Sequence, residues 1–355
     1  MKIKLGEALR YEQPTKYIVA SEKYNDSYAT PVLTAGKSFI LGYTNEESGI
    51  YDNLPVIIFD DFTTDIKYVD FPFKVKSSAM KMLQPANENY NLKFFYYLIK
   101  YMNFQPTSHQ RHWISKFAEM EFDIPERVKQ DQIVEKLDKL VEMQSKKTTQ
   151  LKKYDDLVKS QFIEMFGDPD LSQQKESWDE LENVGEIVGG STPKTSIKEY
   201  WDGDLNWFTP AEIKENDFIV NQSERKITEL GAKSCSLRKM PINTVILSSR
   251  APIGKVALAG CEFYCNQGFK NIVCNENLNP IFLLMLLKYN NEYLNSLGRG
   301  ATFKEISKTI VSKIKIPTPP IELQNQFADF VKHIDKLKFI DVFNNFSKLV
   351  LELYW

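Results

Sequence analysis

Three short segments carry residue types that enzymes use in catalysis. Glu212-Ile213-Lys214 fits the end of a nuclease Asp…Glu-x-Lys site, but no aspartate precedes it at a convincing spacing. Gly254-Lys255-Val256 lacks the Ser or Thr with which a phosphate-binding loop holds magnesium. His109 and His112 could share a metal, yet no carboxylate or thiolate stands beside them at a suitable spacing. We interpret them as loop histidines near phosphate and predict no metal site.

Asn279-Pro280-Ile281-Phe282 approximates the Asn-Pro-Pro-Phe segment with which amino-group DNA methyltransferases hold a flipped base. Here isoleucine replaces the second proline, an apolar run follows at once, and no Gly-rich cofactor loop precedes the segment. We therefore predict that Asn279 caps a helix whose first turn contains Pro280. The chain reads as a non-enzyme.

Length and composition limit the classes of protein to which the chain could belong. With 355 residues, 43% hydrophobic and 26% charged, the chain is long enough for two globular domains. Its longest apolar run, 281–287, is too short to span a bilayer, and the first residues lack the apolar core of a signal peptide, so we expect a cytoplasmic protein with no membrane partner. The four cysteines form no Cys-x-x-Cys pair and favour buried free thiols; they are Cys235, Cys261, Cys265 and Cys274.

Charge is uneven along the chain. The formal net charge of −2 does not by itself indicate nucleic acid. Residues 223–255, however, contain seven basic residues and only two acidic ones. This segment could form a basic face or a set of solvated loops.

The chain repeats itself over most of its length. Ile114-Ser115-Lys116 precedes Pro125 by eleven positions, and Ile306-Ser307-Lys308 precedes Pro317 by eleven. Each proline is followed by a Gln-x-Gln segment, at 130–132 and 324–326, and by an apolar pattern of helical period. Such a repeat exceeds the 20–50 residues of a solenoid unit and indicates two whole domains, each followed by a long helix.

The elements that would position any site are a mixture of short strands and helices. In the first repeat we predict strands over 32–33, 38–43, 56–59, 68–69 and 73–75, since short β-branched runs alternate with Gly, Asn and Asp turns. Residues 91–102 have the broad apolar face of a helix.

Residues 126–166 contain neither Pro nor Gly and predict one long helix, which Gly167-Asp168-Pro169 ends. A heptad stripe runs along it and requires a helical partner, because water would otherwise cover it. A second helix is predicted over 322–354, with a slip of register near Lys338. We expect the two to pair antiparallel; alternatively each packs only on its own domain. The predicted seam consists of Ile133, Leu137, Leu140, Leu151, Tyr154, Val158, Phe327, Val331, Ile334 and Leu337.

Two mixed domains, each ending in Ile-Pro before Gln-x-Gln and a long helix, resemble the specificity subunit of Type I restriction–modification systems. The segments that carry the resemblance include 11–14, 31–36, 59–63, 76–81, 190–193, 266–270 and 316–320. The resemblance implies an α+β fold with two pseudo-repeated target-recognition domains and a pair of long antiparallel spacer helices. We expect domain 1 at 1–125, the central spacer at 126–166, domain 2 at 167–320 and the C-terminal spacer at 321–355.

The resemblance also implies a function. Such a subunit recognises a split, asymmetric sequence in double-stranded DNA and docks modification subunits, two of them in our expectation, and restriction subunits. Those partners methylate adenine at N6 and cleave DNA, so S-adenosylmethionine, ATP and magnesium are expected on them and no cofactor in this chain.

Cationic, polar and aromatic loop residues are the candidates for DNA contact, because phosphates attract Lys and Arg and base edges accept paired hydrogen bonds. In the first domain they are Lys37, Tyr43, Lys74, Lys76, Lys81, His109, Arg111 and His112; in the second they are Lys194, Arg225, Lys226, Arg238, Arg250, Asn266, Gln267 and Lys270. Two other functions stay open: a protein-interaction scaffold on a coiled coil without DNA binding, and an enzyme that uses one of the weak motifs.

Overall fold

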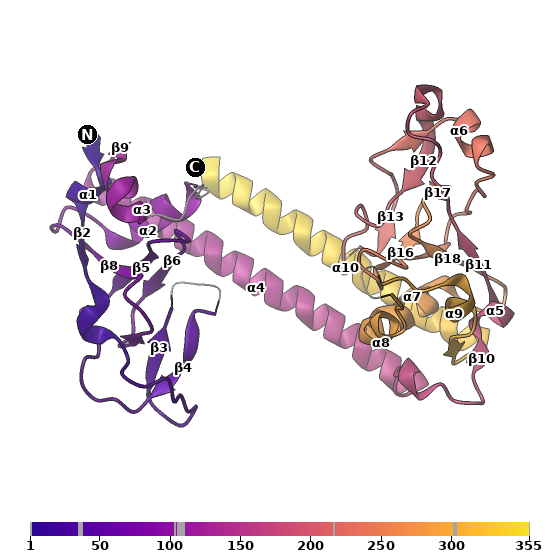
Figure 1. The fold of residues 1–355 in the computed structure, drawn as a ribbon, viewed down its shortest axis with the longest axis horizontal. Helices are drawn as coiled ribbons and strands as arrows, with labels where there is room; N and C mark the ends of the chain where they lie inside the picture. Colours follow the sequence, from indigo (N-terminus) through magenta and orange to yellow (C-terminus); the bar gives the residue numbers. More distant parts are fainter. Residues whose placement is uncertain are drawn as a thin grey trace. The chain divides into compact units, whose positions relative to one another are not determined.

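The computed structural model describes residues 2–34, 38–102, 104, 111–215, 217–300 and 304–354, with the side chains of 339–354 excepted. The chain divides into two compact units, residues 1–147 and 148–355 (Figure 1).

The N-terminal unit is built on a four-stranded antiparallel sheet in the order β2-β8-β5-β6 (Leu9–Glu12, Met80–Pro85, Val56–Asp60, Ile66–Val69). A second sheet of three strands has the order β4-β3-β7 (Ile40–Thr44, Thr30–Leu33, Lys74–Val75). Strands β1 and β9 (Lys2–Lys4, Glu121–Asp123) pair at the ends of the domain. The helices are α1 (Leu5–Ala8), α2 (Leu92–Tyr101), α3 (His112–Ser115) and the 3₁₀ turns Pro14–Tyr17 and Phe117–Glu119.

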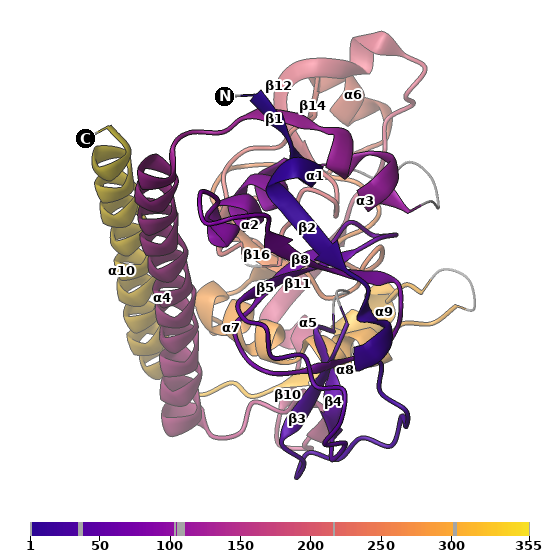
Figure 2. The ribbon, with the colours of Figure 1, turned by 90° about the vertical axis from the view of Figure 1, so that its left-hand side faces the viewer.

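Strand β5 shows why this unit has three layers. Its alternating side chains face opposite ways, as the two-residue period of a strand requires. Ile57 and Phe59 pack in a core with Phe95 of α2, whereas Val56 and Ile58 pack in a second core with Leu33 of β3. The main sheet is therefore enclosed by α2 on one face and the smaller sheet on the other (Figure 2).

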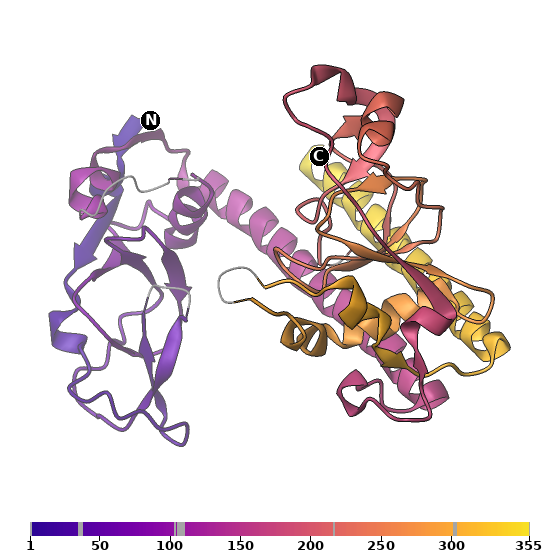
Figure 3. The ribbon, with the colours of Figure 1, turned by 45° about the vertical axis from the view of Figure 1, so that its right-hand side comes forward.

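The C-terminal unit repeats this plan with additions. Its five-stranded sheet has the order β11-β18-β15-β16-β13 (Gly185–Gly189, Lys270–Cys274, Val245–Leu247, Val256–Ala259, Ile219–Val220). A three-stranded sheet has the order β14-β12-β17 (Lys226–Ile227, Trp201–Phe208, Tyr264–Cys265), and β10 pairs with β19 (Asp179–Glu180, Lys315–Ile316). The shorter helices are α5 (Leu181–Val184), α6 (Glu229–Ser234), α7 (Pro280–Tyr289), α8 (Asn291–Ser296), α9 (Lys308–Ser312) and the 3₁₀ turns Leu171–Gln173 and Lys198–Tyr200. In place of α2, α7 packs on the sheet (Figure 3).

Two long helices complete the chain. Helix α4 (Arg127–Phe166) is continuous over 40 residues and ends at Gly167, whose φ of +82° is left-handed, as the Gly-Asp-Pro sequence predicts. Helix α10 (Ile321–Tyr354) follows the second domain, as α4 follows the first. Both predicted long helices are confirmed, as are the five predicted strands and the helix after Asn91. In the N-terminal unit, strands β1, β2, β8 and β9 were not predicted.

Within the C-terminal unit, the second half of α4 runs antiparallel to the first half of α10. Phe162 and Phe166 contact Phe327 near the start of α10, whereas the earlier Asp155 accepts a hydrogen bond from the later Lys338. Aromatic packing and an ion pair thus join these two segments. Helix α7 packs on α4 through Phe282 and also contacts α10. The mixed α+β fold with long antiparallel spacer helices agrees with the sequence prediction.

Candidate nucleic-acid interface

In the C-terminal unit, the loop of residues 190–194 is held closely against strand β17. Gly190 approaches the next segment so closely that a Cβ atom there would lie 2.0 Å from the carbonyl oxygen of Cys265. The amide of Ser191 donates to that same oxygen at 3.0 Å. Glycine is therefore required at this position, and its backbone fixes the loop against β17.

Two tryptophans fix the rest of the loop. Trp207 Nε1 donates to the Ser191 carbonyl at 3.1 Å, and Trp201 Nε1 donates to the Lys194 carbonyl at 3.3 Å. The two rings meet edge to face, with centroids 5.0 Å apart. Both rings are buried, so the loop rests on a rigid aromatic base.

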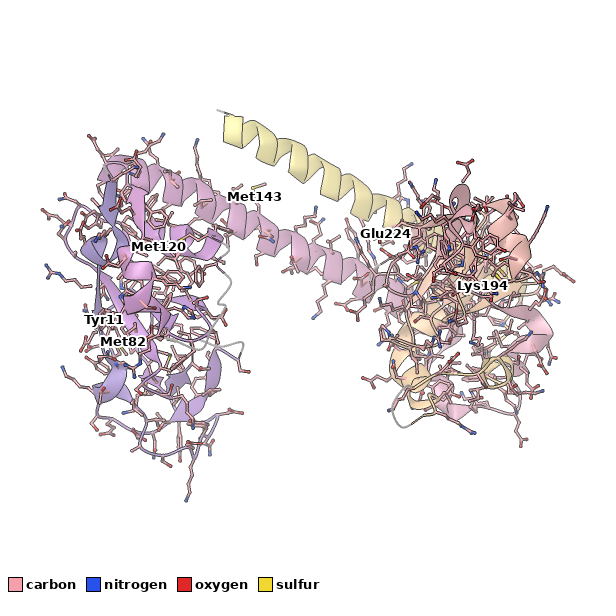
Figure 4. The ribbon with its side chains drawn as sticks, turned by 45° about the horizontal axis from the view of Figure 1, so that its top comes forward. Tyr11, Met82, Met120, Met143, Lys194 and Glu224 are labelled. Atoms are coloured by element: carbon pink, nitrogen blue, oxygen red, sulfur yellow. The ribbon has the colours of Figure 1, made fainter. Side chains whose placement is uncertain are left out.

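Arg225 is exposed and lies over this aromatic base. Its guanidinium carbon is 3.9 Å from the centroid of Trp201 and 5.4 Å from that of Trp207. A guanidinium stacked on indole is attracted by the ring and loses rotational freedom, while its edge stays directed outward. Lys194, also exposed, belongs to the same loop (Figure 4).

Polar residues of 266–270 adjoin the loop. Thr192 donates through its hydroxyl to Gln267 Oε1 at 2.7 Å, and Asn266 Oδ1 accepts from the Gly268 amide at 2.8 Å. Lys270 binds Ser249 Oγ at 3.1 Å and Glu305 at 3.0 Å. Glu305 also pairs with Arg250 at 3.6 Å. Thr192, Lys194, Arg225 and Gln267 thus form one surface, which we call the recognition surface.

Other predicted contacts of this unit lie apart from that arrangement. Arg238 forms an exposed ion pair with Glu186, and Lys226 is half-buried in β14. The single sequence signal that could have identified the recognition surface is the pair of tryptophans six residues apart.

The N-terminal unit corrects several sequence candidates. Lys74 is buried, with an ion pair to Glu46 at 3.0 Å and a hydrogen bond to the Ser48 carbonyl. Lys81 is buried with Asp61, and His112 is also buried. Burial argues against direct DNA contact by these three residues, because a side chain enclosed in the interior cannot reach a phosphate.

The remaining candidates of this unit are on or near its surface. Arg111 is exposed before α3, Tyr43 is half-buried on β4, and Lys76 pairs with Glu22. Tyr11 is exposed beside Lys81, whose ammonium lies 5.4 Å from the ring centroid, and Figure 4 shows Tyr11 next to Met82. Lys37 and His109 lie outside the described residues.

The predicted seam residues have two kinds of partner. Tyr154, Val158, Phe327, Val331, Ile334 and Leu337 pack in the core of the C-terminal unit. Ile133 and Leu137 instead pack against the core of the N-terminal unit, so part of the stripe is covered by its own domain. Leu140 is half-buried, and Leu151 lines a cavity of about 610 Å³ among α4, α7 and α10.

Charged side chains also line this cavity. Burial lowers the pKa of Lys288, as does the nearby Lys338, and Lys288 donates to the Asp217 carbonyl at 2.5 Å. Burial raises the pKa of Asp335. The cavity therefore mixes apolar helix faces with partly desolvated charges.

The motif fragments have structural roles. Asn279 caps α7, with its Oδ1 accepting from the amides of Ile281 and Phe282, which confirms the sequence prediction. Glu212 accepts from the amides of Thr209 and Glu224, at 2.6 Å each, and so ties two loops together.

The cysteines do not form disulfide bonds. All four cysteines are free; Cys265 is buried, which raises its pKa to about 12, and the other three are half-buried. Over the described part of the chain, no cluster of three His, Cys, Asp or Glu side chains could hold a metal. Nor does any described helix have the length and apolar character needed to cross a membrane.

Comparison with known proteins gives a consistent result. A family model for the Type I restriction modification DNA specificity domain matches residues 175–341. The EcoR124I/EcoR124II specificity subunit of Escherichia coli, a type I restriction enzyme, is 35% identical over 362 residues, covering 94% of this chain and 86% of that protein. The MjaIX specificity subunit of Methanocaldococcus jannaschii is 38% identical over 186 residues, 51% of this chain and 43% of that protein.

Among solved structures, the S subunit of a Type I restriction–modification system from M. genitalium is similar with a TM-score of 0.63 and 15% identity, over 99% of this chain and 93% of that one. This likeness concerns the fold. Because the E. coli subunit is 35% identical over 94% of this chain, the chain belongs to the family of type I restriction enzyme specificity subunits.

Proposed function

We propose that this chain is the DNA-recognition subunit of a type I restriction–modification complex and that each unit reads one half of a split, asymmetric target. Family membership supports the role, and the repeated topology of the two units supports two half-sites. The observation that carries the proposal is Arg225, held 3.9 Å over Trp201 beside Lys194 and Gln267.

This arrangement suits direct readout in the major groove. Arginine can donate two hydrogen bonds to guanine, and glutamine can pair with adenine in the same bidentate way. Stacking on Trp201 restricts the Arg225 side chain before DNA arrives, which lowers the entropic cost of ordering it on binding. Lys194 supplies a charge for a phosphate, which positions the unit without selecting a sequence.

Methyl transfer and cleavage belong, in this proposal, to partner subunits. The long helices dock two modification subunits, since the chain offers two similar helix-and-domain arrangements, and restriction subunits join that complex. Asn279 and Glu212 support the assignment because their side chains are engaged in capping α7 and in joining loops. Adenine N6 is the expected methylation site, with S-adenosylmethionine, ATP and magnesium on the partners.

The test begins with the chain co-purified with its modification subunits. Adenine methylation is mapped on genomic DNA, and the resulting duplex is used in fluorescence anisotropy at low and moderate salt. Arg225→Ala should weaken specific binding by about tenfold or more and relax preference at one base pair. Lys313→Ala removes one exposed charge of the same unit, which pairs with Glu180 and Glu182, and serves as the control.

Two results would contradict the proposal. Binding of duplex DNA without sequence preference would contradict the recognition of a split target, and no binding at all would favour the scaffold interpretation. Methyl transfer by the highly purified chain alone, lost on Asn279→Ala, would show that catalysis is not confined to the partners.

A further inference from the structure

Both long helices begin with a buried glutamine. Gln130 is 1% exposed and Gln324 is 0% exposed, whereas Gln132 and Gln326 of the same motifs are exposed. The Gln-x-Gln repeat therefore contains one interior residue and one surface residue in each copy. Of the two glutamines, the interior one bonds to the domain that precedes the helix.

Gln130 connects three segments of the N-terminal unit. Its Oε1 accepts from the backbone amide of Asn91 at 2.8 Å. Its Nε2 donates to the carbonyls of Asn89 and Pro125, at 3.1 and 2.9 Å. The side chain thus joins the start of α4 to the loop that leads into α2.

Gln324 makes the same three bonds in the C-terminal unit. Its Oε1 accepts from the amide of Asn279 at 2.9 Å, and its Nε2 donates to the carbonyls of Asn277 and Pro319 at 3.1 and 2.7 Å. We call each of these arrangements a glutamine joint. The joint occurs twice in one chain with matching partners, so it is not a local accident of packing.

An asparagine strengthens each joint. Asn91 and Asn279 cap α2 and α7 through Oδ1. Through Nδ2 they also donate to Asp131 of α4 at 2.6 Å and to Asn325 of α10 at 2.7 Å. Each short helix and the adjacent long helix are thereby fixed at their first turns.

The length of the helix gives the joint its leverage. At about 1.5 Å per residue, the 40 residues of α4 extend roughly 60 Å. A tilt of about 5° at the first turn would move the far end by about 5 Å, which exceeds the rise of about 3.4 Å per DNA base pair. Small angular freedom at a joint is therefore enough to change which gap length fits.

We infer that Gln130 and Gln324 are positioning residues that fix the number of base pairs between the two half-sequences. The inference rests on the proposed function. Each glutamine fixes the direction in which its helix leaves its domain, because replacing it would leave two backbone carbonyls and one backbone amide without these hydrogen bonds. Base preference within each half-sequence depends on other residues.

The test uses the complex with modification subunits and three duplexes whose gap equals the mapped one or differs by one base pair either way. The native complex should methylate the matching duplex at least about tenfold faster than the others. The Gln130→Met/Gln324→Met variant should reduce that ratio to below about threefold. Half-sequence preference should not change.

The exposed glutamines provide a matched control. Gln132→Met/Gln326→Met changes the same residue types in the same motifs and should keep the native gap ratio. If the buried variant does not assemble, Asp131→Ala/Asn325→Ala loosens the same joints from their exposed side and is judged by the same ratio.

An unchanged gap ratio, or an equal loss of rate on all three duplexes, would overturn the inference. The second result would mean that the glutamines contribute only to stability. Failure of the proposed function is distinguishable, because the native complex would then show no split target at all.

Discussion

Lys81 and Lys270 occupy similar positions in the two units but have different surroundings. Each lies at or near the start of its strand, on β8 and β18, and reaches a residue one or two positions after β5 or β15. Lys81 Nζ is 3.1 Å from Asp61 Oδ2, and Lys270 Nζ is 3.1 Å from Ser249 Oγ. The first pair is buried on both sides, whereas Lys270 shares the half-exposed Glu305 with Arg250.

Lys81→Met should lower the free energy of unfolding of the N-terminal unit by about 3 kcal/mol, because Asp61 would keep a buried charge without its cation. Hydrogen exchange of the β5 and β8 amides measures the change. Lys16→Met, at a side chain 79% exposed, should change it by less than about 0.5 kcal/mol. Similar small effects for both variants would show that the buried pair contributes little.

Lys288 should make stability depend on pH. Its pKa is lowered in the folded chain, chiefly by burial and then by Lys338, so at alkaline pH the unfolded chain binds a proton that the folded chain has released. Stability from this side chain therefore rises with pH through the window below about 10.4, the ordinary lysine value. The charges facing it include Asp155, Asp217 and Asp335.

Melting temperatures at pH 8 and pH 10 provide the measurement. Lys288→Met should remove the alkaline contribution, so the difference between wild type and variant should shift in favour of wild type as pH rises. Lys152→Met, at an exposed lysine lining the same cavity, should leave the difference constant. A constant difference for Lys288→Met would contradict the prediction.

At the scale of elements, α4 owes its stability to packing at both ends. Its first turns pack on the N-terminal core through Val134, and its last turns pack on α7 and α10 through Phe162. The stretch 141–150 is mostly exposed. A helix with this distribution is held by tertiary contacts at its ends and by helical propensity in its middle.

Phe162→Ala should cost the C-terminal unit about 3–5 kcal/mol, because the ring is fully buried against Phe282, Tyr289 and Phe327. Urea unfolding, with hydrogen exchange on α7 and α10, measures the loss. The adjacent Ile163 is 45% exposed, and Ile163→Ala should have a much smaller effect. Equal effects would place the packing on the wrong face of α4.

At the scale of the whole molecule, the repeat provides two domains of similar topology, each with a helix fixed by a glutamine joint. A split target requires this duplication, since one unit of this size can contact only a few base pairs. If the proposed function is correct, the length of the long helices is part of the specificity.

Inserting one heptad into the middle of both long helices should lengthen the gap by about three base pairs, because seven residues add about 10 Å and DNA rises about 3.4 Å per pair. A heptad keeps the apolar stripe in phase. Mapping methylated adenines in DNA from cells that carry the complex measures the gap. An unchanged gap with altered half-sequences would show that the helices do not set the spacing.

Loss of all binding on insertion would have a separate cause. A groove faces the same direction only every 10–10.5 base pairs, so the added length also rotates one half-site relative to the other. The control is the Gln130→Met/Gln324→Met variant, which changes the direction of the long helices and leaves their length unchanged.

The sequence by itself determined the repeat, the long helices and the family. These features depend on short-range patterns: the helical period and the absence of Pro and Gly over 126–166, the capping residue Asn279, and the short apolar, β-branched run of 56–59. Boundaries shifted by one or a few residues. Strand β2 was missed although it alternates, because the alternation covers only four residues, and in β8 the adjacent apolar residues Met82 and Leu83 interrupt the alternation.

Only the tertiary structure decided which charged side chains are exposed and which are buried in ion pairs. Lys74 and Glu46 are 28 positions apart in sequence, and Lys81 and Asp61 are 20 positions apart. No local pattern therefore reveals that folding buries these lysines and pairs them with carboxylates. The same holds for Arg225 on Trp201 and for Gln130 beside Asn91. Sequence spacing encodes secondary structure, whereas burial and ion pairing depend on which distant segments the fold brings into contact.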